Sequence, residues 1–239
     1  MAVHGTTNHK GASGKGASHR GLTQLTFIVD RSGSMAGLES DTIGGFNGML
    51  AKQRAIPGDC SVTTVLFSNR TEMLHDHVDL RKVPDLTGRD YQAGGSTALL
   101  DAIGSTIDEM VARQRHAMPS DRADRVLFVI ITDGYENASR RYSWAQVRRM
   151  ISYERERYGW EFVFLGANID AARAAGDFGI KPECAADFHA DGQGVRVSFA
   201  AVACVATAVR AGADHDGEYM TAALRGVRDD YRSRSHAGR

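Results

Sequence analysis

Three short segments carry oxygen-rich side chains in a pattern that suits a hard metal ion. The first is Asp30-Arg31-Ser32-Gly33-Ser34, in which one carboxylate and two hydroxyls alternate along a single turn. Gly33 allows that turn to fold back, so that the three side chains can converge. Carboxylate and hydroxyl oxygens are donors that Mg²⁺, Mn²⁺ and Ca²⁺ prefer, whereas zinc favours nitrogen and sulfur. The turn therefore predicts part of a divalent-cation site.

The two other segments supply one further oxygen ligand each. Thr97 lies in the glycine-rich run Gly94-Gly95-Ser96-Thr97 just before a predicted helix, and Asp133 follows the most apolar predicted strand. Asp30 ends another predicted strand. Ligands of parallel α/β sheets bind beyond the carboxyl ends of the strands. We therefore expect the three segments to meet at one edge of a sheet.

The elements that position these residues alternate between strands and helices. β-branched and aromatic runs predict strands, and apolar residues at helical spacing predict helices. The expected strands cover 25–30, 60–67, 71–78, 125–132, 161–166 and 185–189, and the expected helices cover 38–54, 99–111, 144–158, 171–178 and 195–209. This order predicts an α/β fold with a doubly wound, mostly parallel sheet, one antiparallel edge strand and helices on both faces.

Each candidate ligand also has an ordinary structural role open to it. Asp30 could cap the following turn, and Ser32 and Ser34 could be turn residues. Thr97 could be a helix N-cap, and Asp133 with the glycine after it could form a plain turn. Independent turns would not be expected to place this ordered set at three strand-to-helix junctions. We therefore favour the cation site.

Three further residues are candidates for supporting that site. Asp101 lies one helical turn after Thr97 and could orient the Thr97 loop, although an ordinary helix carboxylate is the alternative. Gly33 shapes the motif turn, and Asn137 is expected on the rim, shortly after Asp133.

The five residues in this order resemble the metal-ion-dependent adhesion site of the von Willebrand factor type A (VWA) domain. The resemblance covers residues 22–212, and 160–170 (WEFVFLGANID) is similar to stand-alone bacterial and phage-encoded members. It implies a Rossmann-like fold in which Ser32, Ser34 and Thr97 provide hydroxyl ligands. It also implies that Asp30 and Asp133 act directly or through water, and that a partner protein's Asp or Glu carboxylate completes the coordination.

Two other functions compete with this protein-binding module. A metal-dependent phosphatase or hydrolase could use Asp30, because aspartyl-phosphate enzymes also place an aspartate after the first strand. That chemistry wants a second carboxylate or a lysine nearby, but Ser32 stands in the DxD place. No lysine lies near Asp133 in the sequence, where the nearest are Lys82 and Lys181. We therefore expect no enzyme activity. A VWA scaffold of a nucleoprotein complex, with basic termini, is the third possibility.

Composition sets the remaining expectations. The 239 residues carry 29 basic and 29 acidic side chains, so net charge gives no support for nucleic acid as a partner. We expect a disordered basic Gly/Ser-rich tail over 1–21, a VWA domain over 22–212 and a polar Arg-rich C-terminal helix or tail over 213–239 that frays after about residue 225. No apolar run suggests a membrane span or secretion signal, which favours the cytoplasm of a bacterial or phage-infected cell.

Overall fold

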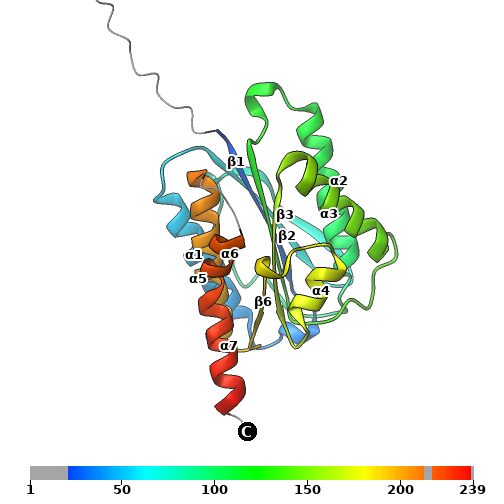
Figure 1. Ribbon diagram of the computed structural model, residues 1–239, viewed down its shortest axis with the longest axis vertical. Coiled ribbons are helices and arrows are strands. Elements are labelled where there is room, and N and C mark those ends of the chain that lie inside the picture. Colours follow the sequence, from blue (N-terminus) through cyan, green and yellow to red (C-terminus); the bar gives the residue numbers. More distant parts are fainter. Residues whose placement is uncertain (1–20, 213–216, 238–239) are drawn as a thin grey trace, which may run out of the picture.

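The computed structural model describes residues 21–212 and 217–237, and these form an α/β sandwich around one sheet (Figure 1). The six strands lie in the order β3-β2-β1-β4-β5-β6, and only the edge strand β3 is antiparallel to its neighbour. The strands are β1 (Thr23–Asp30), β2 (Cys60–Phe67), β3 (Thr71–Asp79), β4 (Arg125–Thr132), β5 (Glu161–Ala167) and β6 (Ala185–Phe188). The predicted fold class is confirmed.

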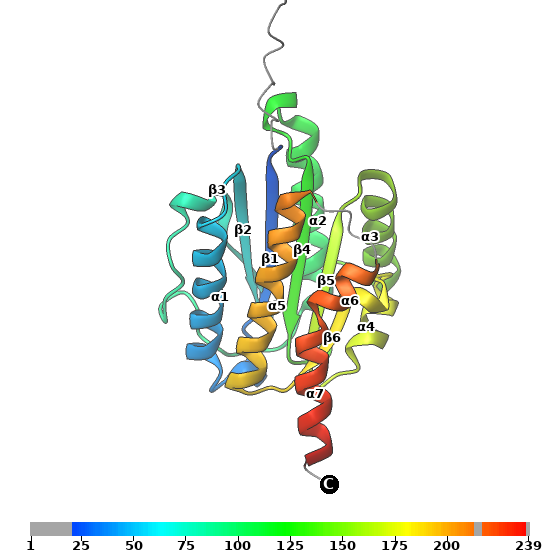
Figure 2. The same cartoon turned by 60° about the vertical axis from the view of Figure 1, so that its left-hand side comes forward.

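Helices cover both faces of the sheet, as Figure 2 shows. One face carries α1 and α5, and the other carries α2, α3 and α4. The helices are α1 (Glu39–Arg54), α2 (Leu99–His116), α3 (Trp144–Tyr158), α4 (Ala171–Asp177), α5 (Gly192–Ala211), α6 (Gly217–Ala223) and α7 (Arg225–Ala237).

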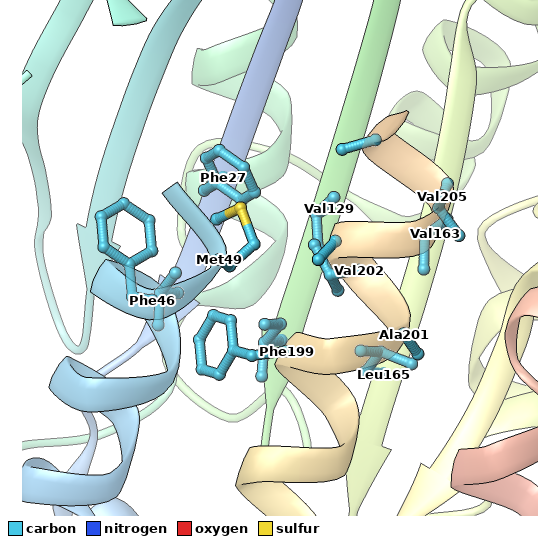
Figure 3. Packing of buried hydrophobic residues seen from close by; sticks show 14 of the residues in the cluster. Phe27, Phe46, Met49, Val129, Val163, Leu165, Phe199, Ala201, Val202 and Val205 are labelled. Atoms are coloured by element: carbon cyan, nitrogen blue, oxygen red, sulfur yellow. The ribbon is translucent and has the colours of Figure 1, made fainter. Parts of the chain in front are cut away.

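The face under α1 and α5 is packed by aromatic and branched side chains (Figure 3). The ring of Phe46 on α1 meets Phe27 of β1 edge-on at 5.4 Å and Phe199 of α5 at 6.3 Å. Val202 of α5 is fully buried against the central strands. These contacts hold β1 and β4 rigidly between two helical layers, and these are the strands that end in Asp30 and precede Asp133.

The other face uses a run of stacked aromatic rings. Phe128 of β4 stacks on Trp160 at 5.5 Å and on Phe162 at 5.0 Å. The α3 helix above them begins at a capping box formed by Ser143 and Gln146. Such a cap satisfies N–H groups that the first turn of a helix leaves without partners.

The C-terminal helices pack on the domain, so the prediction that the chain frays after about residue 225 is wrong for the described part. Leu224 and Val227 belong to the core under α5, and both are at most 1% exposed. Arg234 forms an ion pair with Asp191, the N-cap of α5, at 2.5 Å. The sequence pattern hid this docking because α7 presents few apolar residues. The predicted tail over 1–21 lies outside the described residues, apart from Gly21.

Within residues 21–212 and 217–237, one helix is long and apolar enough to cross a membrane by length and composition alone. This helix is α5, and 67% of its most apolar window is buried inside the structure. Its place against α1 and the sheet explains its composition, because a core helix passes the same test.

Candidate metal centre

The two carboxylates of the predicted site lie side by side at the carboxyl edge of the sheet. Strands β1 and β4 are parallel neighbours, with Val29 paired to Ile131 near their ends. Asp30 is the last residue of β1, and Asp133 directly follows β4. Their exposed fractions are 0% and 1%. Two carboxylates are therefore held out of water at neighbouring strand ends.

The turn after β1 brings its hydroxyls between these carboxylates. The Ser32 N–H donates to Asp30 Oδ1 at 2.7 Å, which closes the start of the turn. Ser32 Oγ and Ser34 Oγ lie 3.1 Å apart, and Ser34 Oγ donates to Asp133 Oδ1 at 2.6 Å. A chain of oxygen atoms thus joins the motif turn to the strand end 99 residues later.

The loop that carries Thr97 closes over the same place. The Gly33 N–H donates to Gly95 O at 2.9 Å, and the Gly94 N–H donates to Arg31 O at 2.8 Å, so the two loops form a small ladder. A methyl group at Gly134 would lie 3.5 Å from both Ser34 Oγ and Thr97 Oγ1. Both hydroxyls therefore border one small space beside the residue that follows Asp133.

Burial makes this site electrostatically costly for its own carboxylates. Desolvation raises the pKa of Asp30, although hydrogen bonds from Thr132 and Ser32 partly oppose the rise. Desolvation also raises the pKa of Asp133; the Ser34 hydroxyl lowers it, and the charge of Asp30 raises it further. A cation between the two groups would remove both the repulsion and part of the desolvation penalty.

The donor set fits a hard divalent cation. Asp133 Oδ2 is buried and accepts no hydrogen bond from any described residue. Such a charged oxygen is unfavourable unless an ion or water meets it. Among the described residues no three His, Cys, Asp or Glu side chains cluster around a common point, so only a site that includes hydroxyl ligands can form here. All five predicted ligands belong to that oxygen-only set, and their role as ligands stays a prediction.

Two residues that support the site were missed from the sequence. Thr132 Oγ1 donates to Asp30 Oδ2 at 2.6 Å, and the buried Tyr91 hydroxyl donates to the Asp30 carbonyl oxygen. Thr132 directly precedes Asp133, so its position beside a predicted ligand is a sequence signal for a supporting role. No spacing rule points to Tyr91, because it comes from an irregular segment before Thr97.

The three predicted supporting residues have different positions. Asn137 Oδ1 accepts the Thr97 N–H at 2.9 Å and so holds the Thr97 loop directly. Gly33 shapes the ladder described above. The Asp101 carboxylate instead accepts the N–H groups of residues 140, 141 and 142 at 2.8–2.9 Å. The idea that it orients the Thr97 loop is wrong, because its oxygens are used by the segment after Asp133.

Glu136, rather than Asp101, connects the start of α2 to the loop that follows Asp133. Its carboxylate accepts the N–H groups of Leu100 and Ser139 at 2.9 and 2.7 Å, and thereby joins the start of α2 to the loop after β4. The Thr97 and Asp133 loops are therefore tied together by Glu136 and Asn137 side by side.

Comparison with solved structures shows which fold carries this site. Proximal thread matrix protein 1 from the mussel byssus matches with a TM-score of 0.52 and 15% identity, over 78% of this chain and 46% of that protein. A von Willebrand factor type A protein from Catenulispora acidiphila matches with a TM-score of 0.50 and 12% identity, over 75% of this chain and 41% of its own. The chain has the fold of a von Willebrand factor type A domain.

These structural likenesses show the fold of the chain and nothing beyond the fold. This chain spans about half the length of the mussel protein. The D319A mutant of the PilB minor pilin from Streptococcus sanguinis also matches, with a TM-score of 0.51 and 13% identity, over 81% of this chain and 63% of its own. No family model and no curated protein matches the sequence. One structure of the mussel protein, with a TM-score of 0.52 and 16% identity, has a zinc-occupied metal-ion-dependent adhesion site (MIDAS) motif.

Proposed function

We propose that this VWA domain is a protein-binding module that depends on a divalent cation. The ion is held at the carboxyl edge of the sheet, and an Asp or Glu side chain of the partner protein completes its coordination. The residues that hold the ion are Asp30, Ser32, Ser34, Thr97 and Asp133.

The buried Asp133 Oδ2 carries this proposal. It has no hydrogen-bond donor among the described residues, while its other oxygen is fixed by Ser34. The Ser34 and Thr97 hydroxyls border the same space. A cation in that space satisfies the orphaned oxygen and finds two further oxygen donors beside it.

The charge of the ligand set explains why an acidic partner is favoured. Two carboxylates balance a doubly charged ion, and the three hydroxyls are neutral. Because the hydroxyl ligands are neutral, they do not reduce the charge of the ion further, and the ion stays electrophilic. An incoming carboxylate is therefore a better last ligand than a neutral carbonyl group. We propose Mg²⁺ or Mn²⁺ as the ion, or Ca²⁺, because all donors are oxygens. Zinc in the related motif of the mussel protein supports a divalent ion without fixing its identity.

The same geometry favours binding over catalysis. Asp30 would be the nucleophile of an aspartyl-phosphate enzyme, but it is fully buried and both its oxygens accept hydrogen bonds. Of the lysines in the described residues, Lys52 lies in the last turn of α1, Lys82 follows the antiparallel β3 and Lys181 precedes β6. All three therefore lie towards the other edge of the sheet, where they cannot stabilise a phosphate at Asp30.

The surface around the ion offers contacts for an acidic segment. Tyr135, two residues after Asp133, is 64% exposed. Beside the Thr97 loop lies an open pocket of about 610 Å³, whose lining includes Arg70, Ser96 and Arg140. Neither arginine forms an ion pair with a described residue, whereas Arg31 within the motif turn is paired with Glu72. Residues that flank the partner's carboxylate would meet Tyr135 and these two arginines.

Capture experiments with the purified domain test this proposal. Immobilised wild-type protein is expected to retain a partner from lysate in Mg²⁺ and to release it in EDTA. Asp133→Asn should retain nothing in either buffer, because the orphaned charged oxygen is removed while the shape is kept. Arg149→Ala changes an exposed arginine on α3 and serves as the matched control that behaves like wild type.

Two outcomes would contradict the proposal. One is partner capture that is equal in Mg²⁺ and EDTA, because the ion would then have no role in recognition. The other is hydrolysis of p-nitrophenyl phosphate by the Mg²⁺-loaded protein that Asp30→Asn abolishes, because the site would then be catalytic.

A further inference from the structure

A second pocket lies at the opposite edge of the sheet from the metal centre. It has a volume of about 340 Å³ and sits where α2 and α3 end and β4 begins. This volume is within the range of small-molecule sites. Among its lining residues are Val111 of α2, Val126 of β4 and Glu154 of α3. None of the residues that line this pocket belongs to the metal centre.

Glu154 is the unusual member of the lining. Its residue is only 5% exposed, yet no described residue donates a hydrogen bond to its carboxylate or forms an ion pair with it within 4 Å. Its pKa is raised by burial, and Arg115 opposes the rise only through the longer-range attraction of its charge. The two carboxylate oxygens still reach the water in the pocket, since neither is among the buried oxygens without a hydrogen-bond partner. A cation in the pocket would replace that water with a charge-assisted contact.

The rest of the lining defines what kind of cation fits. Trp160 is 5% exposed and is stacked on Phe128, so its indole forms a rigid apolar wall beside Val126. Two polar side chains are already occupied: Gln114 exchanges hydrogen bonds with the backbone of Ala123, and Arg122 donates to Ala117 O at 3.2 Å. The pocket thus combines apolar walls with the carboxylate of Glu154, and its lining adds one further negative charge, the exposed Asp124, and the positive charge of Arg115.

We propose that this pocket binds an organic cation, an ammonium or guanidinium group on a short apolar stem, with the charge against Glu154 and the stem against Trp160. The ligand is either a free small molecule or a lysine or arginine side chain of another protein. A neutral molecule of the same shape would leave Glu154 unpaired and therefore bind more weakly.

Trp160 provides a built-in reporter for the test. The chain has two tryptophans, and Trp144→Phe leaves Trp160 as the only one. Titration of this protein with n-butylguanidinium should give a saturable change in Trp160 fluorescence. n-Butanol, the neutral probe, should bind at least about tenfold more weakly, since one charge-assisted pair is worth roughly a factor of ten or more.

Substitutions locate the binding and challenge it. Glu154→Gln keeps the shape and should weaken n-butylguanidinium binding at least about tenfold. Glu156→Gln, two residues away and exposed, should change nothing. Arg115→Ala removes a positive charge that repels the cationic ligand, so it should leave butylguanidinium binding unchanged or tighten it. Equal binding of butanol and butylguanidinium, unchanged binding by Glu154→Gln, or weaker binding by Arg115→Ala would overturn the proposal.

A second measurement keeps the test independent of variant folding. In the unsubstituted protein, nuclear Overhauser effects are expected from the butyl protons to the Trp160 ring and the Val111 methyl groups, and their absence at saturation would overturn the proposal. The peptide acetyl-Gly-Arg-Gly-amide then separates the two sources of ligand. Binding of the peptide as well identifies a protein side chain, whereas binding of butylguanidinium alone identifies a small molecule.

Discussion

The two edges of the sheet both bury carboxylates, but they treat them in opposite ways. At the carboxyl edge, Asp30 and Asp133 are surrounded by hydroxyl and N–H donors, and only one oxygen of the pair, Asp133 Oδ2, is left without a partner. At the amino edge, the Glu154 carboxylate has apolar walls and no hydrogen-bond donor among the described residues.

The difference shows how far each site is prepared for its ligand. At the carboxyl edge, hydrogen bonds already fix both oxygens of Asp30, the Ser34 hydroxyl and one oxygen of Asp133, so little ordering would remain for an ion to impose. At the amino edge, Glu154 has only the longer-range attraction of Arg115 and no hydrogen bond from a described residue, so the ligand must supply the close contact. Substitutions at the first site should therefore act mainly on affinity, and those at the second also on stability.

The largest expected effect comes from Asp133→Asn. The variant should lose more Mg²⁺ affinity than the about 10–100-fold caused by changing groups that merely orient metal ligands. Its charged oxygen is the one that no protein donor satisfies. Isothermal calorimetry with Mg²⁺ measures the loss, and circular dichroism checks that the fold is retained. An unchanged dissociation constant would remove Asp133 from the site.

A smaller loss of Mg²⁺ affinity is expected for Thr132→Val. This substitution deletes the hydroxyl that donates to Asp30 Oδ2 and keeps the shape of the side chain. Mg²⁺ affinity should fall by about 10–100-fold, because Asp30 loses the group that orients it. The same calorimetric titration measures this change. Affinity equal to wild type would show that Asp30 is held sufficiently by Ser32 alone.

The fold was predictable because its signals are local and repeated. The run 125–132 is apolar on both faces, as in a covered parallel sheet, and the run 60–67 is rich in β-branched residues; the predicted bounds of both strands are the observed ones. The docking of α7 was not predictable, because it depends on a few contacts such as Leu224 and on the ion pair of Arg234.

The site was predictable to the extent that it follows the strand ends. Asp30 and Asp133 lie at one edge because parallel strands of a covered sheet end at the same edge. They are neighbours because the strand order places β4 beside β1. The partners of Asp101 and Glu136 were not predictable, since the path of an irregular loop decides which carboxylate each N–H meets. Glu154 lies in a charge-rich stretch of the sequence that does not single it out, and only its exposed fraction of 5% in the folded chain shows that it is buried.

Asp101→Ala should act on stability and leave the ion alone. Loss of the acceptors for residues 140–142 is expected to lower the free energy of unfolding by about 1–3 kcal/mol. Partial burial raises the pKa of Asp101, but the three backbone N–H groups outweigh it, so the pKa is lowered below its usual 3.8. The stabilisation should therefore be present above that value and disappear as the pH falls below it. Urea unfolding at pH 7 and pH 3 measures both effects. A weakened Mg²⁺ affinity would contradict the assignment of Asp101 to the loop.

The smallest expected effect is a gain of stability in Glu154→Gln. Burial raises the pKa of Glu154 above its usual 4.5, so the unfolded chain releases its proton first and the wild type loses stability as the pH rises past that value. The variant should be more stable than the wild type at pH 7, and this difference should vanish near pH 4. Thermal unfolding at the two pH values, without added ligand, makes the comparison. A variant that is less stable at pH 7 would mean that Glu154 already has a partner in solution.

The position of the ion itself tests the central claim most directly. Crystals soaked in MnCl₂ and measured at a wavelength where manganese scatters anomalously show where the ion binds. One strong peak is expected between Asp133 Oδ2 and the hydroxyls of Ser34 and Thr97, with a coordination position open to solvent or to a neighbouring carboxylate. No peak there at full soaking, or a peak only elsewhere on the domain, would contradict the metal centre.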